Sequence, residues 1–380
     1  MWLSRRNGFK GVVAIALACA LAGTLAACGG GGNDGAPGEG QGEPVATYQG
    51  KTVTDVEFGK YLSLFELISP MEAMYAQIFP EYKEQLLKQY ILRKEYAAKA
   101  TKDDRKEAAE NAAAFREQLD AALKDESRKE AVRDILDKSG LTSKEAERML
   151  KMLISAELAI GRKYEEIKDT VTEDEIRQEF EKAPSDYNIV TVRHILVATT
   201  DSMTGEALRT EEEALARAKD VRAKLIAGGS WDELAAEYSD DQGSKMNGGL
   251  YADARAGDWV EAFKQAANTQ PVGVIGEPVL TEFGYHVILV EKREEMTFEK
   301  LPQETKDELL EAIAGPRLDE QFRQELEALG IEITLPQEEP PSDEESGGAE
   351  EGSGAEDGGA DEAEGAGGEG EGGAEGEAAQ

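Results

Sequence analysis

The two histidines of this 380-residue sequence, His194 and His286, are the side chains best suited to chemistry. Each lies in a segment predicted to be a β-strand, Ile189–Ala198 and Tyr285–Val290, because β-branched and apolar residues dominate both. Neighbouring antiparallel strands can place two such side chains beside each other on one face of a sheet. The pair could set the polarity of a binding site, although two hydrogen-bonded core histidines would give the same pattern.

Hydrolytic and metal chemistry are disfavoured by what the sequence lacks. It contains no HExxH motif, and single histidines on strands do not have the spacing of zinc ligands. It contains no Gly-x-Ser-x-Gly motif, which argues against a serine hydrolase. The two cysteines, Cys19 and Cys28, lie near the N-terminus, so the remaining chain can form neither a disulfide nor a thiolate zinc site. We therefore expect no metal and no cofactor.

Both histidines belong to a module of mixed helices and strands. Apolar spacing predicts a helix over Glu211–Ala227, and Ser230 with Glu233 starts a second, shorter helix. A polar loop, a third helix and two strands follow, over Ser239–Gly249, Trp259–Ala267, Gly276–Leu280 and Tyr285–Val290. This order predicts a sheet flanked by helices, with one histidine in its first strand and the other in its last.

Four short motifs follow one another along the module: Val192-Arg193-His194-Ile195-Leu196-Val197, Tyr238-Ser239-Asp240-Asp241, Gly243–Gly249 and Phe283-Gly284-Tyr285-His286-Val287-Ile288. In this order and spacing, across Asp186–Arg293, they resemble the parvulin family of peptidyl-prolyl cis/trans isomerases. The layout of the wider chain resembles the PrsA-type foldase lipoproteins, which share helical chaperone segments with SurA. The motifs are specific in combination, whereas the wider likeness rests on layout.

The parvulin resemblance implies a fold and a site. It implies a four-stranded antiparallel sheet flanked by helices, whose fourth strand we expect near Asn247–Tyr251. It assigns catalysis to His194, Asp241 and His286. It assigns the binding of a proline ring to four apolar side chains, Leu250, Trp259, Phe263 and Phe283.

Two departures from the family pattern alter the rim of the expected proline site. The usual Gly-Gly-Asp-Leu-Gly-Trp/Phe run is here Gly248-Gly249-Leu250-Tyr251-Ala252-Asp253. The methionine usual near the proline ring is replaced by Trp259, which could narrow the site. Both departures leave the histidine pair intact.

Outside the module the sequence predicts mostly helices, so the fold class is α+β. Val45–Val53 predicts a hairpin, and Thr54 with Glu57 predicts a capping box at the start of the first helix. A last helix near Glu304–Leu329 is expected to pack back on the first ones, which makes the helical domain discontinuous. The expected divisions are a signal peptide (1–27), a lipidated cysteine and flexible tether (28–44), a SurA-like helical domain (45–186), the parvulin domain (187–293), returning C-terminal helices (294–335) and a disordered acidic tail (336–380).

The N-terminal residues predict export and a lipid anchor. A basic stretch, Met1–Gly11, precedes an apolar run, Val12–Ala22, that is too short to span a bilayer comfortably. Leu25-Ala26-Ala27-Cys28 resembles the lipobox of bacterial lipoproteins, which implies a lipidated Cys28 on the outer face of the cell membrane. An ordinary cleaved signal followed by a stray cysteine is the alternative.

The charge of the chain excludes one class of partner. The formal net charge is −36, so the protein repels phosphate backbones and nucleic-acid binding is not expected. Gln337–Gln380 is rich in Gly, Ala and Glu and lacks large apolar side chains, which predicts disorder. This tail could be a solubilising segment or could bind divalent cations or cell wall.

The expected function is an extracytoplasmic isomerase and foldase. Its partners would be unfolded or partly folded secreted proteins that contain X-Pro bonds. The sequence leaves open whether the protein also forms a homodimer. The alternative is a non-catalytic holdase chaperone, because Phe58–Tyr96 is rich in Met and aromatic residues. That segment would equally suit an ordinary helical core.

Overall fold

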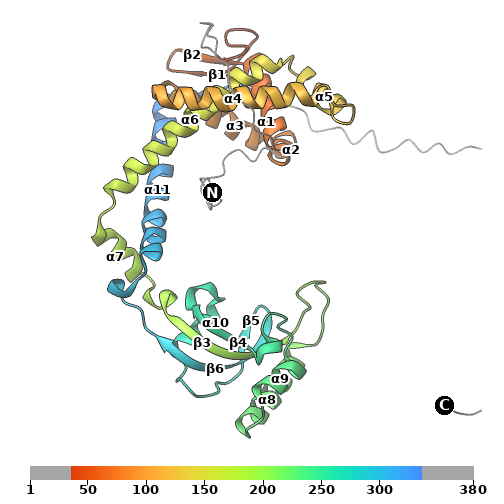
Figure 1. Ribbon diagram of the computed structural model, residues 1–380, viewed down its shortest axis with the longest axis vertical. Helices are drawn as coiled ribbons and strands as arrows, with labels where there is room; N and C mark the ends of the chain where they lie inside the picture. Colours follow the sequence, from red (N-terminus) through yellow and green to blue (C-terminus); the bar gives the residue numbers. More distant parts are fainter. Residues whose placement is uncertain (1–35, 336–380) are drawn as a thin grey trace, which may run out of the picture. The chain divides into compact units, whose positions relative to one another are not determined.

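The computed structural model describes residues 36–335 (Figure 1). The predicted signal peptide, the predicted lipidation site Cys28 and the predicted acidic tail (336–380) lie outside the described residues. Within residues 36–335, no helix combines the length and the apolar character needed to cross a bilayer.

Helices make up most of the chain before the mixed module. Pro70 and Pro80 occupy the first positions of two of them, where a helix needs no N–H donor. Thr142 and Thr172 form capping boxes that start two others. The helices are α1 (Asp55–Ile68), α2 (Pro70–Ile78), α3 (Pro80–Ala98), α4 (Lys102–Ala122), α5 (Lys129–Asp137), α6 (Ser143–Thr170) and α7 (Glu173–Glu181).

The chain returns to these helices after the mixed module. Helix α11 (Gln303–Leu329) contacts α3, α6 and α7, and the ring of its Phe322 packs edge-on against Tyr96 of α3 with centroids 5.5 Å apart. A small antiparallel sheet joins the two ends of the described chain, in the strand order β2 (Lys51–Thr54), β1 (Pro44–Tyr48) and β7 (Glu332–Ile333). The expected packing of the last helix is therefore observed, while the domain boundaries themselves stay a prediction.

The start of α1 differs from the predicted capping box. Thr54 Oγ1 accepts a hydrogen bond from the Glu57 amide, as expected. The Glu57 carboxylate does not complete the box, because it is fully buried and accepts hydrogen bonds from Tyr90 Oη at 2.8 Å and Lys94 Nζ at 2.6 Å. A buried carboxylate needs such partners, because leaving its charge unpaired would cost more than leaving out the second half of the cap.

The predicted flexible tether is partly folded. Residues 36–43 form turns against the start of α1, where the Glu43 amide donates to Asp55 Oδ1 at 2.9 Å. The Gly38 carbonyl accepts from Thr54 Oγ1 at 3.2 Å. The first turn of a helix leaves backbone donors without partners, and a Gly-rich segment can lie close to it.

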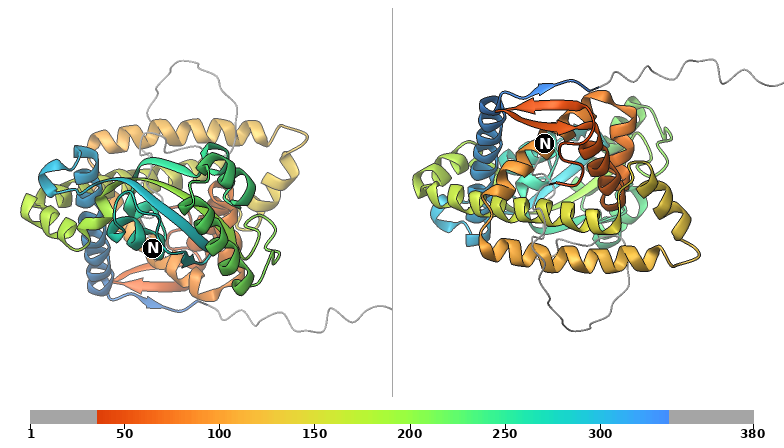
Figure 2. Two further views of the ribbon diagram at one scale, coloured as in Figure 1. Left: turned by 90° about the horizontal axis from the view of Figure 1, so that it is seen from below. Right: turned by 90° about the horizontal axis from the view of Figure 1, so that it is seen from above.

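The mixed module forms the expected four-stranded antiparallel sheet, in the order β4-β3-β6-β5. The strands are β3 (Ile189–Ala198), β4 (Leu250–Arg255), β5 (Val279–Thr281) and β6 (Gly284–Glu294), and β3 and β6 run side by side along their lengths (Figure 2). The fourth strand begins later than predicted, because Lys245–Asn247 forms a 3-10 helix and Gly248 and Gly249 both adopt positive φ.

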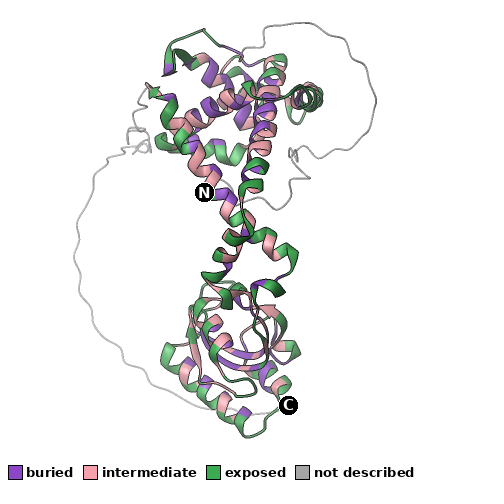
Figure 3. Ribbon diagram, turned by 90° about the vertical axis from the view of Figure 1, so that its left-hand side faces the viewer, coloured by how far each residue is buried: buried purple, intermediate pink, exposed green. Residues whose placement is uncertain are grey.

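Helices cover both faces of this sheet. Helices α8 (Glu211–Ile226) and α9 (Trp231–Tyr238) pack on the face that carries Ile195 and Val287. Helix α10 (Glu261–Thr269) packs on the other face, with Phe263 buried against strand residues. Figure 3 colours the strands of this sheet mostly as buried or intermediate, and the outer surfaces of its helices as exposed. Short 3-10 helices lie in the connections, at Pro184–Tyr187, Ala256–Asp258 and Phe298–Lys300.

Candidate active site on the parvulin-like sheet

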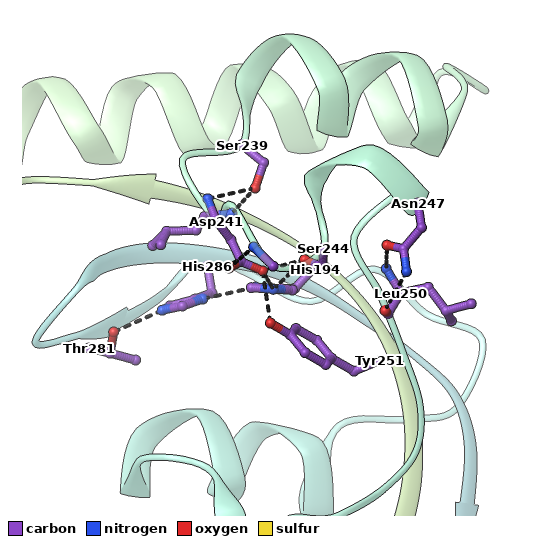
Figure 4. Close-up of polar contacts among 11 residues, drawn as sticks. His194, Ser239, Asp241, Ser244, Asn247, Leu250, Tyr251, Thr281 and His286 are labelled. Atoms are coloured by element: carbon purple, nitrogen blue, oxygen red, sulfur yellow. Dashed lines mark hydrogen bonds and ion pairs between the residues drawn. The ribbon is translucent and has the colours of Figure 1, made fainter. Parts of the chain in front are cut away.

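The two histidines meet on the α10 face of the sheet. In the antiparallel register of β3 and β6, His194 is paired with Ile288 and His286 with Leu196, so the histidines are diagonal neighbours. Their rings stack at an interplanar angle of 19°, and their Nδ1 atoms are 3.1 Å apart (Figure 4). Each residue is only 4% exposed, so the pair forms a buried floor and is not a surface feature.

A line of hydrogen bonds continues from both ends of the pair. Thr281 Oγ1 lies 2.8 Å from His286 Nε2, and Asp241 Oδ2 lies 2.9 Å from His194 Nε2 (Figure 4). All four ring nitrogens therefore have a partner. Of the two ends, Asp241 is a charged group with a partly exposed side chain, so it can meet a ligand directly.

The loop after α9 holds Asp241 in place. The Asp241 amide donates to Ser239 Oγ at 3.3 Å, and the Gly243 amide donates to Asp241 Oδ1 at 3.1 Å. Three groups surround Oδ2, because Ser244 Oγ and Tyr251 Oη also donate to it, the latter at 3.1 Å. The carboxylate is thus fixed from several directions.

A glycine brings the following segment against the first histidine. Gly249 has φ +72°, a backbone conformation that favours glycine, and a Cβ atom there would lie 1.9 Å from the His194 carbonyl oxygen. Its own carbonyl accepts from the His194 amide at 2.9 Å. This position requires glycine because β3 and the start of β4 approach each other so closely.

The contacts allow one consistent set of tautomers when both histidines are neutral. The Asp241 carboxylate can only accept, so His194 Nε2 carries the proton and its Nδ1 accepts. His286 Nδ1 then donates to His194, and His286 Nε2 accepts from the Thr281 hydroxyl. The line is polarised in one direction, from Thr281 toward Asp241.

The electrostatics agree with the roles given to Asp241 and His286. Burial alone would raise the pKa of Asp241, but hydrogen bonds from His194 and Ser244 outweigh it and hold that pKa well below its usual range. Burial, together with neighbouring His194, lowers the pKa of His286 to about 3. At neutral pH the network therefore contains an ionised carboxylate and a neutral His286.

Aromatic rings surround the histidine pair. The Phe263 ring packs edge-on against both imidazoles, with centroid distances of 5.3 Å to His194 and 5.2 Å to His286. Trp259 packs on Phe263 with centroids 5.0 Å apart. Phe263 is only 4% exposed, so a ligand can reach more of its ring only if a neighbouring side chain moves.

The structure thus brings together His194, Asp241 and His286 with Phe263 and Trp259. Phe283 lies at the edge of this group and is 45% exposed, and its amide donates to Thr281 Oγ1 at 3.2 Å. Its ring is open to a ligand.

Leu250 does not lie with the other predicted proline-binding residues. It pairs with Arg193, whereas Tyr251 pairs with Val192, which shares the α10 face with His194. Because side chains alternate along a strand, Tyr251 and not Leu250 faces the imidazoles (Figure 4). In the family run Gly-Gly-Asp-Leu, the leucine corresponds to Tyr251 and the aspartate to Leu250, so the expectation for Leu250 was placed one residue too early.

Sequence reasoning also missed three polar members of the site, Ser244, Tyr251 and Thr281. Ser244 stands in the Gly243–Gly249 motif, and Thr281 precedes the motif of the second histidine, so both positions carried a signal. Tyr251 occupies the leucine position of the family run, so this position carried a signal too, and the strand register shows that its side chain faces the histidines.

The donor set does not form a metal site. Among residues 36–335, no group of three or more His, Cys, Asp or Glu side chains is arranged to hold a metal ion. The two histidines bind each other and a carboxylate, so their nitrogens are occupied.

Known proteins resemble the chain over this module and over part of the helical region. Relatives include the chaperone SurA of Chromohalobacter salexigens, 37% identical over 142 residues, which make up 37% of this chain and 30% of that protein. The foldase protein PrsA 3 of Bacillus anthracis is 31% identical over 206 residues, or 52% of this chain and 63% of that protein. The chain thus matches less than two thirds of the length of either relative.

A crystal structure of the peptidylprolyl isomerase PrsA from Bacillus cereus is 25% identical to the chain, with a TM-score of 0.34. The comparison covers 75% of this chain and 89% of that one. A family model described as the PPIC-type PPIase domain matches residues 175–294, which include every side chain of the hydrogen-bonded line. Residues 175–294 therefore form a PPIC-type peptidyl-prolyl isomerase domain of the parvulin family.

Proposed function

We propose that the chain is an extracytoplasmic peptidyl-prolyl cis/trans isomerase and foldase that acts on X-Pro bonds of unfolded or partly folded secreted proteins. One observation supports this most directly. Thr281, His286, His194 and Asp241 form an unbroken hydrogen-bonded line on the sheet floor, with the charged group at its exposed end.

The reaction requires a twisted peptide bond and no covalent intermediate. Conjugation of the amide opposes rotation by about 18–20 kcal/mol and places negative charge on the carbonyl oxygen. Twisting breaks the conjugation, so that oxygen becomes less negative. A carboxylate near the oxygen therefore repels the planar state more than the twisted state, which is differential binding of the transition state.

Asp241 is the proposed carboxylate in this mechanism. Hydrogen bonds from His194 and Ser244 keep it ionised and fix its position. His286 and Thr281 orient the His194 ring from behind. Phe263 and Phe283, with Trp259 at the rim, would hold the proline ring, and the buried state of Phe263 implies that Trp259 moves when a substrate binds.

The proposed location rests on the N-terminal sequence and on the named relatives. A basic stretch, an apolar run and Leu25-Ala26-Ala27-Cys28 suit a lipoprotein signal. Relatives are named foldase and chaperone proteins, which suits unfolded clients. Mass spectrometry of the protein from membranes tests the anchor, because lipidation adds mass at Cys28 and a Cys28→Ala variant should leave the membrane fraction.

The isomerase activity can be tested on an X-Pro peptide by exchange spectroscopy. We expect the full chain to accelerate cis/trans exchange in proportion to its concentration. An exchange rate equal to that of the peptide alone would contradict the proposal.

A holdase function is a second candidate, favoured by the surface of α2. Five large apolar side chains of this helix and its C-cap are exposed, among them Met71 at 66% and Ile78 at 58%; the others are Met74, Tyr75 and Phe79. Exposed apolar groups of this density are uncommon on a soluble surface and suit the binding of unfolded chains.

The holdase can be separated from the isomerase by paired substitutions. Met71→Ser with Ile78→Ser should weaken the suppression of client aggregation and leave X-Pro exchange unchanged. Met203→Ser with Ile226→Ser makes the same chemical change at exposed positions in the isomerase domain, 90% and 57% exposed, and should not affect aggregation. Equal aggregation curves for the two pairs would count against a client surface on α2.

A further inference from the structure

The register of β4 places a phenol beside the histidine pair. Tyr251 is opposite Val192 in the β3–β4 pairing, and both face α10. The Tyr251 ring lies with its centroid 5.4 Å from that of His194, tilted by 39°. Its hydroxyl donates to Asp241 Oδ2 at 3.1 Å (Figure 4). One side chain therefore contacts the floor and the charged end of the hydrogen-bonded line.

The two oxygens of Asp241 have unequal surroundings. Oδ2 accepts hydrogen bonds from His194 Nε2, Ser244 Oγ and Tyr251 Oη. A carboxylate oxygen offers about two lone-pair directions, so Oδ2 has all the donors it can use. Among the described residues, the hydrogen bonds to Oδ1 come from the Gly243 amide alone. Oδ1 consequently keeps a lone pair for which no protein donor competes.

We propose that Tyr251 is a positioning residue for the isomerase reaction, which holds Oδ2 inward so that Oδ1 is presented to the carbonyl of the bound X-Pro bond. This role rests on the proposed isomerase function. Burial and then the Asp241 charge raise the pKa of the Tyr251 phenol, which keeps the hydroxyl protonated and able to donate at neutral pH.

Tyr285 provides a matched control within the same domain. Its hydroxyl also donates to a carboxylate at 3.1 Å, that of Glu211. Tyr285 belongs to the apolar cluster on the opposite, α8 face of the sheet. Tyr251→Phe and Tyr285→Phe therefore remove the same kind of hydrogen bond, and each keeps the ring that fills the space.

The test is a double-mutant cycle, in which kcat and KM of full-chain variants are measured on an X-Pro peptide. Tyr251→Phe should lower kcat by about fivefold with KM little changed, the effect of one lost hydrogen bond. Tyr285→Phe should leave both constants unchanged. In an Asp241→Ala background, Tyr251→Phe should have no further effect, because the group through which it acts is absent.

Three results would overturn the role of Tyr251. These are an equal loss in both backgrounds, an equal loss from Tyr285→Phe, or unchanged kinetics in Tyr251→Phe. The ¹³C carboxyl chemical shift of Asp241 at neutral pH separates this role from the proposed function. It should change in Tyr251→Phe and not in Tyr285→Phe, and an unchanged chemical shift would refute the positioning even in an active enzyme. A wild-type chain that accelerates no X-Pro bond would instead refute the proposed function, and the positioning role with it.

Discussion

His194 and His286 are diagonal neighbours across β3 and β6, and their Nδ1 atoms are 3.1 Å apart although 92 positions separate them in sequence. A diagonal pair lets the two rings stack, where a directly opposite pair would bring the side chains closer at Cβ. Both residues are buried, so in the proposed mechanism they would act on a ligand through Asp241 and not by direct contact. The pair is therefore a polar floor that orients the carboxylate.

The stability of the isomerase domain should fall in acid because of His286. Its pKa is lowered to about 3 from an ordinary value of 6.5. Between these two pH values His286 is protonated in the unfolded chain and neutral in the folded domain. This contribution is complete above pH 6.5 and is lost as the pH falls toward 3. The lowered pKa of Asp241 acts in the same direction, starting below its ordinary value of 3.8. The slope for His286 is at most about 1.4 kcal/mol per pH unit.

Urea unfolding between pH 7 and pH 4 measures this effect. Trp231 and Trp259 are the tryptophans among the described residues and both lie in the isomerase domain, so their fluorescence reports its unfolding. The stability of the wild type relative to a His286→Gln variant should decrease as the pH falls. Parallel curves over this range would show that His286 is not held neutral.

Gly249 should tolerate no side chain. An alanine Cβ would lie 1.9 Å from the His194 carbonyl, so β3 and β4 would have to separate. We expect Gly249→Ala to reduce the unfolding free energy by more than about 4 kcal/mol. Gly273 is the control, since it also has positive φ, +79°, but no atom within 4 Å of the added Cβ. Gly273→Ala should cost only about 1–2 kcal/mol. Similar losses in the two variants would disprove the close approach.

Trp259 should restrict access to the proline site. Its ring covers part of Phe263, and a methionine there would adapt to a ligand at lower cost in packing. Trp259→Met is therefore expected to lower KM for X-Pro peptides about threefold, and kcat should change less. Trp231→Met makes the same change at a half-buried position of the opposite face and should leave KM unaltered. A higher KM in Trp259→Met would show that the indole adds more to proline binding than it obstructs, and would contradict this prediction.

The sequence predicts the strands because they depend on local patterns, and the resemblance to the parvulin family predicts the meeting of the histidines. Ile189–Ala198 is a strand with the predicted bounds, since its β-branched residues leave little alternative. The capping residue Ser230 likewise starts a helix where expected. The packing of α11 on the first helices also agrees with its apolar pattern.

The sequence could not predict features that depend on register or on long-range partners. Tyr251 and not Leu250 faces the histidines because of the register of β4, which tertiary contacts determine. The Glu57 side chain does not cap α1 as predicted, because it accepts hydrogen bonds from Tyr90 and Lys94, which are distant in sequence. Residues 36–43 fold because they hydrogen-bond to Thr54 and Asp55 at the start of α1, and composition alone does not reveal these contacts.

The most direct test of the isomerase site compares Asp241→Ala with the wild type in cis/trans exchange of one X-Pro peptide. Near-UV circular dichroism establishes that both proteins are folded. If the carboxylate at the end of the histidine line favours the twisted bond, kcat/KM should fall at least about tenfold, equal to 1.4 kcal/mol of transition-state stabilisation. A folded Asp241→Ala protein with wild-type kcat/KM would contradict the account.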